Sequence, residues 1–175
     1  IAGDYKGRRL ETPAGNQVRP TTDKVKEALF SILAEKIWDS RVLDLFSGTG
    51  NLGIEALSRG AKECVFGDNS RESIRLIKDN IAHCRAEDGA RVIPGDYKKI
   101  LMNSEEPFDI ILLDPPYGKG YLEESFGLIA EYRLLAEDGV VIAEHRKEEI
   151  LPEEWYGFTK IKERRYGIIM LSIYS

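Results

Sequence analysis

From Arg41 onward the sequence alternates between short apolar runs of strand type and segments with helical periodicity. Such an alternation predicts repeated β-α-β units, in which the strands form a parallel sheet and the helices cover both of its faces. The predicted strands span residues 42–46, 63–68, 90–94, 108–113 and 139–143. The predicted helices span residues 52–58, 70–83, 97–102 and 121–132. The predicted fold class is therefore α/β.

The two ends of the chain depart from this pattern. Residues 158–163 and 166–174 are strand-like, and only Arg164 and Arg165 separate them, which is too short for a crossover helix and predicts an antiparallel hairpin. Residues 1–20 are rich in Gly, Arg and Pro and predict a short hairpin or extended arm. Residues 21–38 predict a helix that joins this arm to the sheet as a lid. We therefore expect a basic extension, residues 1–38, and a main domain, residues 39–175, in one compact unit.

Charge is unevenly distributed along the chain. The formal net charge is −5, yet residues 1–26 carry six basic and three acidic side chains, which leaves −8 on the rest. Exposed charges act over about 8 to 10 Å, so a basic arm on an acidic body can attract phosphate locally. An ordinary solvated terminus is the alternative. The chain has no signal peptide pattern and no apolar run of about 20 residues, so we expect a cytoplasmic protein without membrane contact.

The two cysteines, Cys64 and Cys84, lack the spacing of a metal site, so we expect both to be buried thiols without a chemical role. His83 and His145 have no clear catalytic partners, and we expect structural roles for them. In the C-terminal hairpin, Lys160, Lys162, Arg164 and Arg165 are expected on a solvated face, with RNA contact as the alternative.

The apolar run at 108–113 leads directly into Asp114, Pro115, Pro116 and Tyr117. The two prolines make this loop extended and stiff, and their missing N–H groups leave carbonyl oxygens free to accept hydrogen bonds. A carboxylate, free carbonyls and an aromatic ring at the end of a strand suit a planar group that carries an N–H donor. A turn-forming acid and a packing ring are the structural alternative.

The segment 44–53 contains the pattern G-x-G-x-x-G between a predicted strand and a predicted helix, and Asp68 follows Gly48 by 20 residues. Taken literally, this is the dinucleotide fingerprint, which predicts a nicotinamide-dependent oxidoreductase. Three features oppose that interpretation: a long segment precedes the loop, no hydride-handling Tyr/Lys or His constellation follows it, and little chain remains for a substrate domain. An S-adenosylmethionine site needs the same glycines and the same ribose-binding acid.

Further acids follow the predicted strands at positions that suit S-adenosylmethionine. Asp44 can meet the ammonium group of this methyl donor, and Asp96 and Tyr97 can meet its adenine. Because these groups share one edge of the sheet, they predict a common cofactor site. The residues expected to bind S-adenosylmethionine are Asp44, Phe46, Ser47, Gly48, Thr49, Gly50, Gly53, Asp68, Asn69, Ser70, Gly95, Asp96, Tyr97 and Asp114.

Together, segment 44–53, Asp68, Asp96 and the Asp-Pro-Pro-Tyr loop resemble the class I, Rossmann-like methyltransferases that modify exocyclic nitrogens. A closer resemblance, to the bacterial RsmD-type family, covers nearly the whole chain. It lies in residues 1–3 (Ile-Ala-Gly), 7–10 (Gly-Arg-Arg-Leu) and 19–30, which begin Arg-Pro-Thr. Two positions depart from the usual family pattern: Ser47 stands where Ala is frequent, and Gly67 where a bulkier residue is common.

The resemblance implies methyl transfer from S-adenosylmethionine to the N2 of a guanine in small-subunit ribosomal RNA. It implies a seven-stranded, mostly parallel sheet with its first and fourth strands adjacent. The acceptor nitrogen would be aligned by Asp114, Pro115, Pro116 and Tyr117, with Tyr117 stacked on the base. We expect RNA contacts from Arg8, Arg9, Arg19, Thr21, Lys24, Lys26 and Lys119.

The expected partner is ribosomal RNA within a ribonucleoprotein particle, the expected oligomeric state is a monomer, and no metal is expected. The Asp-Pro-Pro-Tyr box alone leaves other acceptors open. Related boxes occur in DNA or RNA adenine-N6 enzymes, cytosine-N4 enzymes and protein glutamine methyltransferases. A nicotinamide-dependent oxidoreductase and a non-catalytic RNA-binding module are alternatives of other classes.

Overall fold

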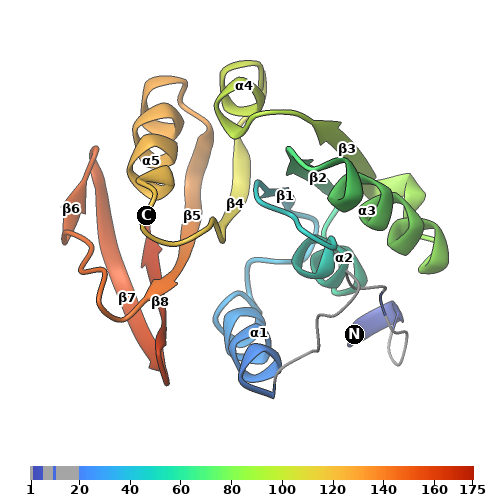
Figure 1. The fold of residues 1–175 in the computed structure, drawn as a ribbon, viewed down its shortest axis with the longest axis horizontal. Coiled ribbons are helices and arrows are strands. Elements are labelled where there is room, and N and C mark those ends of the chain that lie inside the picture. The colour runs from blue at the N-terminus through green and yellow to red at the C-terminus, as the bar shows by residue number, and fades with distance from the viewer. Residues whose placement is uncertain (1, 6–9, 11–19) are drawn as a thin grey trace.

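A computed structural model describes residues 2–5, 10 and 20–175, and side chains in the first helix from residue 23 onward. Its centre is an eight-stranded sheet in the order β3-β2-β1-β4-β5-β8-β7-β6 (Figure 1). The first five strands are parallel, as predicted: β1 (Arg41–Asp44), β2 (Glu63–Asp68), β3 (Ala90–Pro94), β4 (Phe108–Leu113) and β5 (Leu135–Arg146). The last three are antiparallel to their neighbours: β6 (Glu154–Trp155), β7 (Phe158–Tyr166) and β8 (Ile169–Tyr174).

Helices cover both faces of the sheet, which confirms the predicted architecture. One core packs beneath α1 (Pro20–Ile32), α2 (Asn51–Ser58) and α3 (Arg71–His83). The other packs beneath α4 (Tyr97–Met102) and α5 (Tyr121–Glu131). Two short 3₁₀ turns, η1 (Gly3–Tyr5) and η2 (Glu87–Gly89), complete the described elements. Successive strand residues alternate between the two cores, as the period of a strand requires. No helix among the described residues is both long and apolar enough to cross a membrane.

The C-terminal hairpin is present, but its predicted turn is wrong. Strand β7 continues through Arg164 and Arg165, and the chain reverses at Gly167 and Ile168, between the paired residues Tyr166 and Ile169. Gly167 has φ of +63°, the left-handed conformation that a two-residue hairpin turn demands of its first central residue. The sheet also has eight strands instead of seven, because the two-residue β6 pairs with β7.

Helix α1 is part of the first core, where Leu29, Phe30 and Leu33 are almost fully buried. The buried carboxylate of Glu55, on α2, binds groups of the N-terminal region. The Lys26 ammonium lies 2.9 Å from Glu55, the Arg59 guanidinium 2.8 Å, and the backbone N–H of Ala2 donates to it at 3.0 Å. Burial opposes the ionisation of Glu55, but these partners outweigh burial and lower its pKa. Helix α1 and Ala2 are therefore both anchored to α2 through Glu55.

Candidate active site

A cavity of about 840 Å³ lies at the carboxyl ends of the parallel strands. Eleven of the predicted site residues line it: Phe46, Gly48, Asp68, Asn69, Gly95, Asp96, Tyr97, Asp114, Pro115, Pro116 and Tyr117. Five other described residues complete the lining: Leu45, Lys98, Tyr121, Glu124 and Glu144. Strand β1 pairs with β4 on one side and with β2 on the other, and all three are parallel. Their carboxyl ends, and the loops that follow them, therefore lie at one edge of the sheet.

The glycine loop is held in shape by the end of β2. The Asp68 carboxylate accepts the N–H of Gly48 at 2.9 Å with one oxygen and the N–H of Ser70 at 2.9 Å with the other. Gly50, at φ of +83°, precedes α2 in a left-handed conformation. A Cβ on Gly53 would lie 2.3 Å from the Phe66 ring, so only glycine lets α2 approach β2 this closely.

Six predicted cofactor residues, in the glycine loop or beside it, do not line the described cavity wall: Asp44, Ser47, Thr49, Gly50, Gly53 and Ser70. Ser47 donates from its hydroxyl to the Asp44 carbonyl at 2.5 Å, and the Thr49 carbonyl accepts from the Asn80 amide at 2.9 Å. Ser70 caps α3 by accepting the N–H of Ser73. The contacts that the structure gives these residues shape the loop.

Asp44 is a buried acid beneath the loop, only 2 % exposed, and its carboxylate accepts the N–H of Gly53 at 3.1 Å. Burial, together with repulsion from Asp114 and Asp68, raises the pKa of Asp44 to about 7 despite this hydrogen bond. No lysine, arginine or histidine of the described segments forms an ion pair with it. A cation placed here would be strongly favoured.

Replacing Asp44 with Asn should remove a pH dependence of stability. The folded-state pKa lies above the ordinary value of 3.8, so the folded protein holds a proton that the unfolded chain releases. The wild-type free energy of unfolding should therefore fall, through Asp44, as pH rises from about 4 to 7. Urea unfolding without ligand should show Asp44→Asn more stable than wild type at pH 8 by a few kcal/mol, with the difference shrinking to about 1 kcal/mol at pH 4.5. Parallel stability profiles would contradict the assignment.

Aromatic rings form one wall of the cavity. The Tyr97 ring lies 5.2 Å from that of Phe46 and 5.1 Å from that of Tyr121, measured between centroids. The Tyr97 hydroxyl donates to Glu124, and Asp96 caps α4 by accepting the N–H of Lys98 at 3.0 Å. Sequence patterns did not indicate Tyr121 or Glu124, because their direction depends on how the loop 117–120 places the first turn of α5.

At the end of β4, the Asp-Pro-Pro-Tyr loop brings Asp114 to the cavity. Glu144 on β5 lines the cavity beside it, and burial raises the pKa of Asp114. Burial also raises the pKa of Tyr117 to about 12. The Arg146 guanidinium lies 4.9 Å from the Tyr117 ring centroid, which leaves the opposite face for any planar ligand. Glu144 was not among the site residues predicted from the sequence, although it directly follows the predicted strand 139–143.

The predicted RNA contacts fall into three groups. Arg8, Arg9 and Arg19 lie outside the described residues, as does the side chain of Thr21. Lys24 and Lys119 are exposed, and Lys119 lines a second cavity of about 370 Å³ beside Tyr117. Lys26 is held by Glu55 and by the Asn51 amide oxygen at 2.8 Å.

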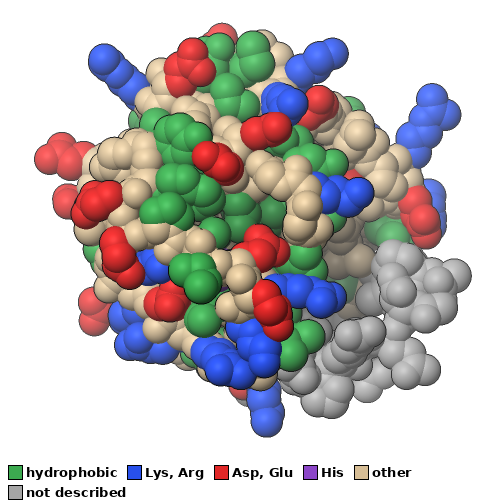
Figure 2. All heavy atoms as spheres, turned by 60° about the vertical axis from the view of Figure 1, so that its left-hand side comes forward, with side chains coloured by type: hydrophobic (Ala, Val, Ile, Leu, Met, Phe, Trp, Pro, Cys, Tyr) green, Lys and Arg blue, Asp and Glu red, His purple; other side chains and the backbone are tan. Residues whose placement is uncertain are grey.

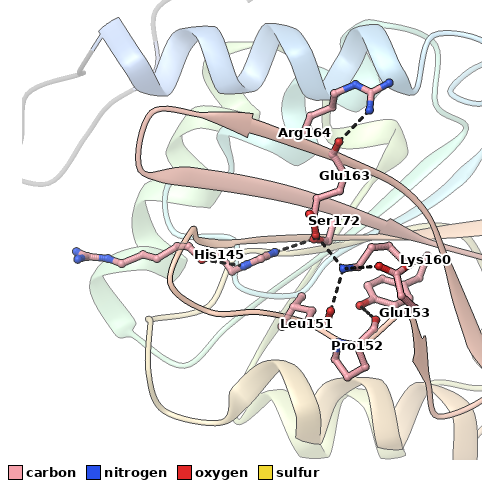
Figure 3. Close-up of polar contacts among 10 residues, drawn as sticks. His145, Leu151, Pro152, Glu153, Lys160, Glu163, Arg164 and Ser172 are labelled. Carbon is pink, nitrogen blue, oxygen red and sulfur yellow. Dashed lines mark hydrogen bonds and ion pairs between the residues drawn. The ribbon is translucent and has the colours of Figure 1, made fainter.

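In the C-terminal hairpin, the expected solvated position of Lys160 is wrong. Its side chain is 7 % exposed, and its ammonium group donates to the Leu151 carbonyl at 2.9 Å and pairs with Glu163 at 2.8 Å (Figure 3). Buried His145 contacts the Ser172 hydroxyl at 2.7 Å in the same network (Figure 3). Lys162, Arg164 and Arg165 are exposed. Cys64 and Cys84 are both buried, and no described cluster of His, Cys, Asp or Glu is arranged to hold a metal.

Comparison with known proteins identifies relatives along the full length. The sequence profile of the family described as "Conserved hypothetical protein 95" matches residues 1–175. YlbH of Bacillus subtilis is 41 % identical, with 100 % of this chain and 97 % of that protein covered. The ribosomal RNA small subunit methyltransferase D of Escherichia coli K12 is 34 % identical, covering 100 % and 88 %. The solved structure of yhhF from Escherichia coli matches with a TM-score of 0.87 at 33 % identity, over 99 % of this chain and 94 % of that one.

Proposed function

Because this chain belongs to the family described as conserved hypothetical protein 95, we propose that it transfers a methyl group from S-adenosylmethionine to the N2 of a guanine in small-subunit ribosomal RNA. The relationship confirms the resemblance to the RsmD-type family, and the chain is a methyltransferase of that family. One observation carries the proposal: a single cavity joins Asp68 beside the glycine loop to the Asp114–Tyr117 loop. Donor and acceptor sites therefore open into the same space.

The residues present fit S-adenosylmethionine, which when bound supplies an activated methyl group on a sulfonium. Buried Asp44 lacks a cationic partner among the described residues, and its raised pKa marks a position where the ammonium of the donor would be favourable. Asp68 would accept hydrogen bonds from ribose hydroxyls. The rings of Phe46 and Tyr97 form an apolar wall for the adenine. Nicotinamide chemistry has no comparable support from these residues.

Asp114 would hold the acceptor nitrogen. The lone pair of an exocyclic amine is conjugated with the base, so the enzyme chiefly needs to align the nitrogen and stabilise the positive charge that grows on it. The Asp114 carboxylate and the Pro115 carbonyl would accept hydrogen bonds from the amine, and the free face of Tyr117 would pack against the base. A paired base could not reach this cavity, so we propose an unpaired or flipped nucleotide as target.

The RNA itself would be bound by cationic groups outside the cavity. Figure 2 shows acidic side chains spread over the face that carries α5 and β6, with basic side chains gathered toward its lower edge. We propose that residues 1–38 are the RNA-binding extension, and that α1, fixed in the core, presents Lys24. Lys119 lies beside the cavity and would meet a nearby phosphate. The proposed substrate is a ribonucleoprotein particle, bound by a monomer.

Charge reversal at Arg8 and Arg9, both outside the described residues, should weaken RNA binding without changing the affinity for S-adenosylmethionine. Two lost phosphate contacts should reduce the slope of log affinity against log salt by about 1 to 2. RNA titrations at several salt concentrations and calorimetric titration of the cofactor measure the two effects. Lys78→Glu, on exposed α3, is the matched control. An unchanged salt slope would assign RNA binding to other residues.

The experiment that tests the function uses labelled S-adenosylmethionine with small-subunit particles, naked ribosomal RNA or protein extract, followed by nucleoside and amino-acid analysis. We expect label in N2-methylguanosine. Label in N6-methyladenosine or methylglutamine would replace the proposed acceptor. RNA binding without any transfer, in protein that binds the donor, would overturn the proposed activity.

A further inference from the structure

Glu144 and Asp114 occupy equivalent positions on neighbouring strands. Leu113 of β4 is paired with Ala143 of β5, so the next residue of each strand lies side by side. Leu112 and Ile142, two residues earlier, point into the core beneath α1 and α2, so Asp114 and Glu144 continue the same face. Both residues line the cavity. The adjacency therefore follows from strand register, because Asp114 directly follows the last paired residue of β4.

The Asp114 and Glu144 carboxyl groups meet at this position in one cavity, and two adjacent carboxyl groups in a partly buried site favour holding one proton between them. Burial and the neighbouring Asp114 raise the pKa of Glu144 to about 9, so Glu144 is the proton holder at neutral pH. Its O–H would then donate to the Asp114 carboxylate. This arrangement leaves a carbonyl oxygen on Glu144 and a carboxylate oxygen on Asp114 as two neighbouring acceptors.

Among the nucleobases, guanine is the one that matches two adjacent acceptors through an exocyclic amine. Its N1–H and its N2 amino group are neighbouring donors on one edge. Adenine and cytosine also carry an amino group, but the ring nitrogen beside it is an acceptor and would face an acceptor oxygen. Uracil has a ring N–H without an amino group. A buried acceptor that meets another acceptor loses its hydrogen bond, which is costly in a water-excluded site.

We propose that Glu144 selects guanine by accepting a hydrogen bond from its N1–H, while Asp114 accepts from the N2 amine. This inference rests on the proposed function and deepens it: Asp114 aligns the reacting nitrogen, and Glu144 reads the base. Glu144 also fixes Asp114 through the shared proton. The Asp-Pro-Pro-Tyr box can bind several kinds of amine. The pair of Asp114 and Glu144 would make it prefer the amine of guanine.

The test replaces the target guanine with 2-aminopurine, which keeps the N2 amine but has an acceptor at N1. A synthetic RNA segment carrying either base at the mapped target is ligated into small-subunit RNA and assembled into particles. The ratio of kcat/KM for guanine to kcat/KM for 2-aminopurine should be at least about tenfold larger for wild type than for Glu144→Ala. Glu144→Gln should keep the wild-type preference, because its amide N–H can donate to Asp114 and its oxygen can accept from N1–H.

Glu148→Ala, at an exposed position four residues along the chain, is the matched control and should keep the wild-type preference. Cofactor affinity, measured by calorimetry, shows that each variant is folded. A Glu144→Ala enzyme with the wild-type guanine preference, or a Glu144→Gln enzyme without it, would overturn the assignment. Wild-type protein that methylates neither base would instead overturn the proposed function, so the two failures are distinguishable.

Discussion

Replacement of Asp114 by alanine is expected to lower the rate constant of methyl transfer by about 10²- to 10³-fold while S-adenosylmethionine still binds. The carboxylate directly follows β4, half-buried beside Glu144, and lines the cavity. Its proposed contribution is made when positive charge grows on the acceptor nitrogen, and in a water-excluded site such a charge interaction is strong. Single-turnover methyl transfer with saturating cofactor measures this rate directly.

Asp114→Asn separates charge from shape in the same experiment. The amide retains an oxygen that can accept from the amine but has no negative charge, so its rate should fall between those of wild type and Asp114→Ala. The control is Asp88→Ala, an exposed acid on η2 far along the sheet, which should transfer methyl groups at the wild-type rate. If Asp114→Ala kept near-normal turnover, the carboxylate would have no role in charge stabilisation.

Much of this site follows from two rules applied to the sequence. Alternating strand and helix patterns predict a parallel sheet, and ligands bind at the carboxyl ends of its strands. These rules bring together Asp68 and Asp114, which are far apart in sequence but line one cavity. The 20-residue spacing predicted Asp68 as a ribose-binding acid, and the structure adds that its carboxylate also accepts the N–H of Gly48 in the glycine loop. Adjacency of β1 and β4 came from the family resemblance and is confirmed.

The misses have separate physical causes. Glu144 follows a predicted strand just as Asp114 does, but no motif surrounds it, and its importance comes from pairing across strands. Lys160 is a cation that composition places at the surface, whereas its ammonium group is held by the Leu151 carbonyl and by Glu163, three residues along β7. The hairpin turn was placed at two arginines, although Gly167 supplies the positive φ that the turn needs.

Asp68→Ala is expected to raise the dissociation constant for S-adenosylmethionine by about 100-fold. Two losses combine: the acceptor for the ribose hydroxyls disappears, and the N–H groups of Gly48 and Ser70 lose the oxygens that accept from them at 2.9 Å. The glycine loop would then lose one of its contacts to the end of β2, beside the bond in which the Ser47 N–H donates to the Gly67 carbonyl at 2.9 Å. Isothermal titration calorimetry measures the change.

The control for Asp68 is Asp79→Ala, on the exposed face of α3, where the acid pairs only with Arg75 among its described neighbours. That variant should bind the donor as wild type does, since an exposed pair of this kind contributes little. Asp68 acts before chemistry, so at saturating donor its variant should recover most of its methyl transfer rate, whereas Asp114→Ala should not. If added donor failed to restore Asp68→Ala, the carboxylate would serve the reacting groups as well as the ribose, and the division of the cavity into a donor end and an acceptor end would be wrong.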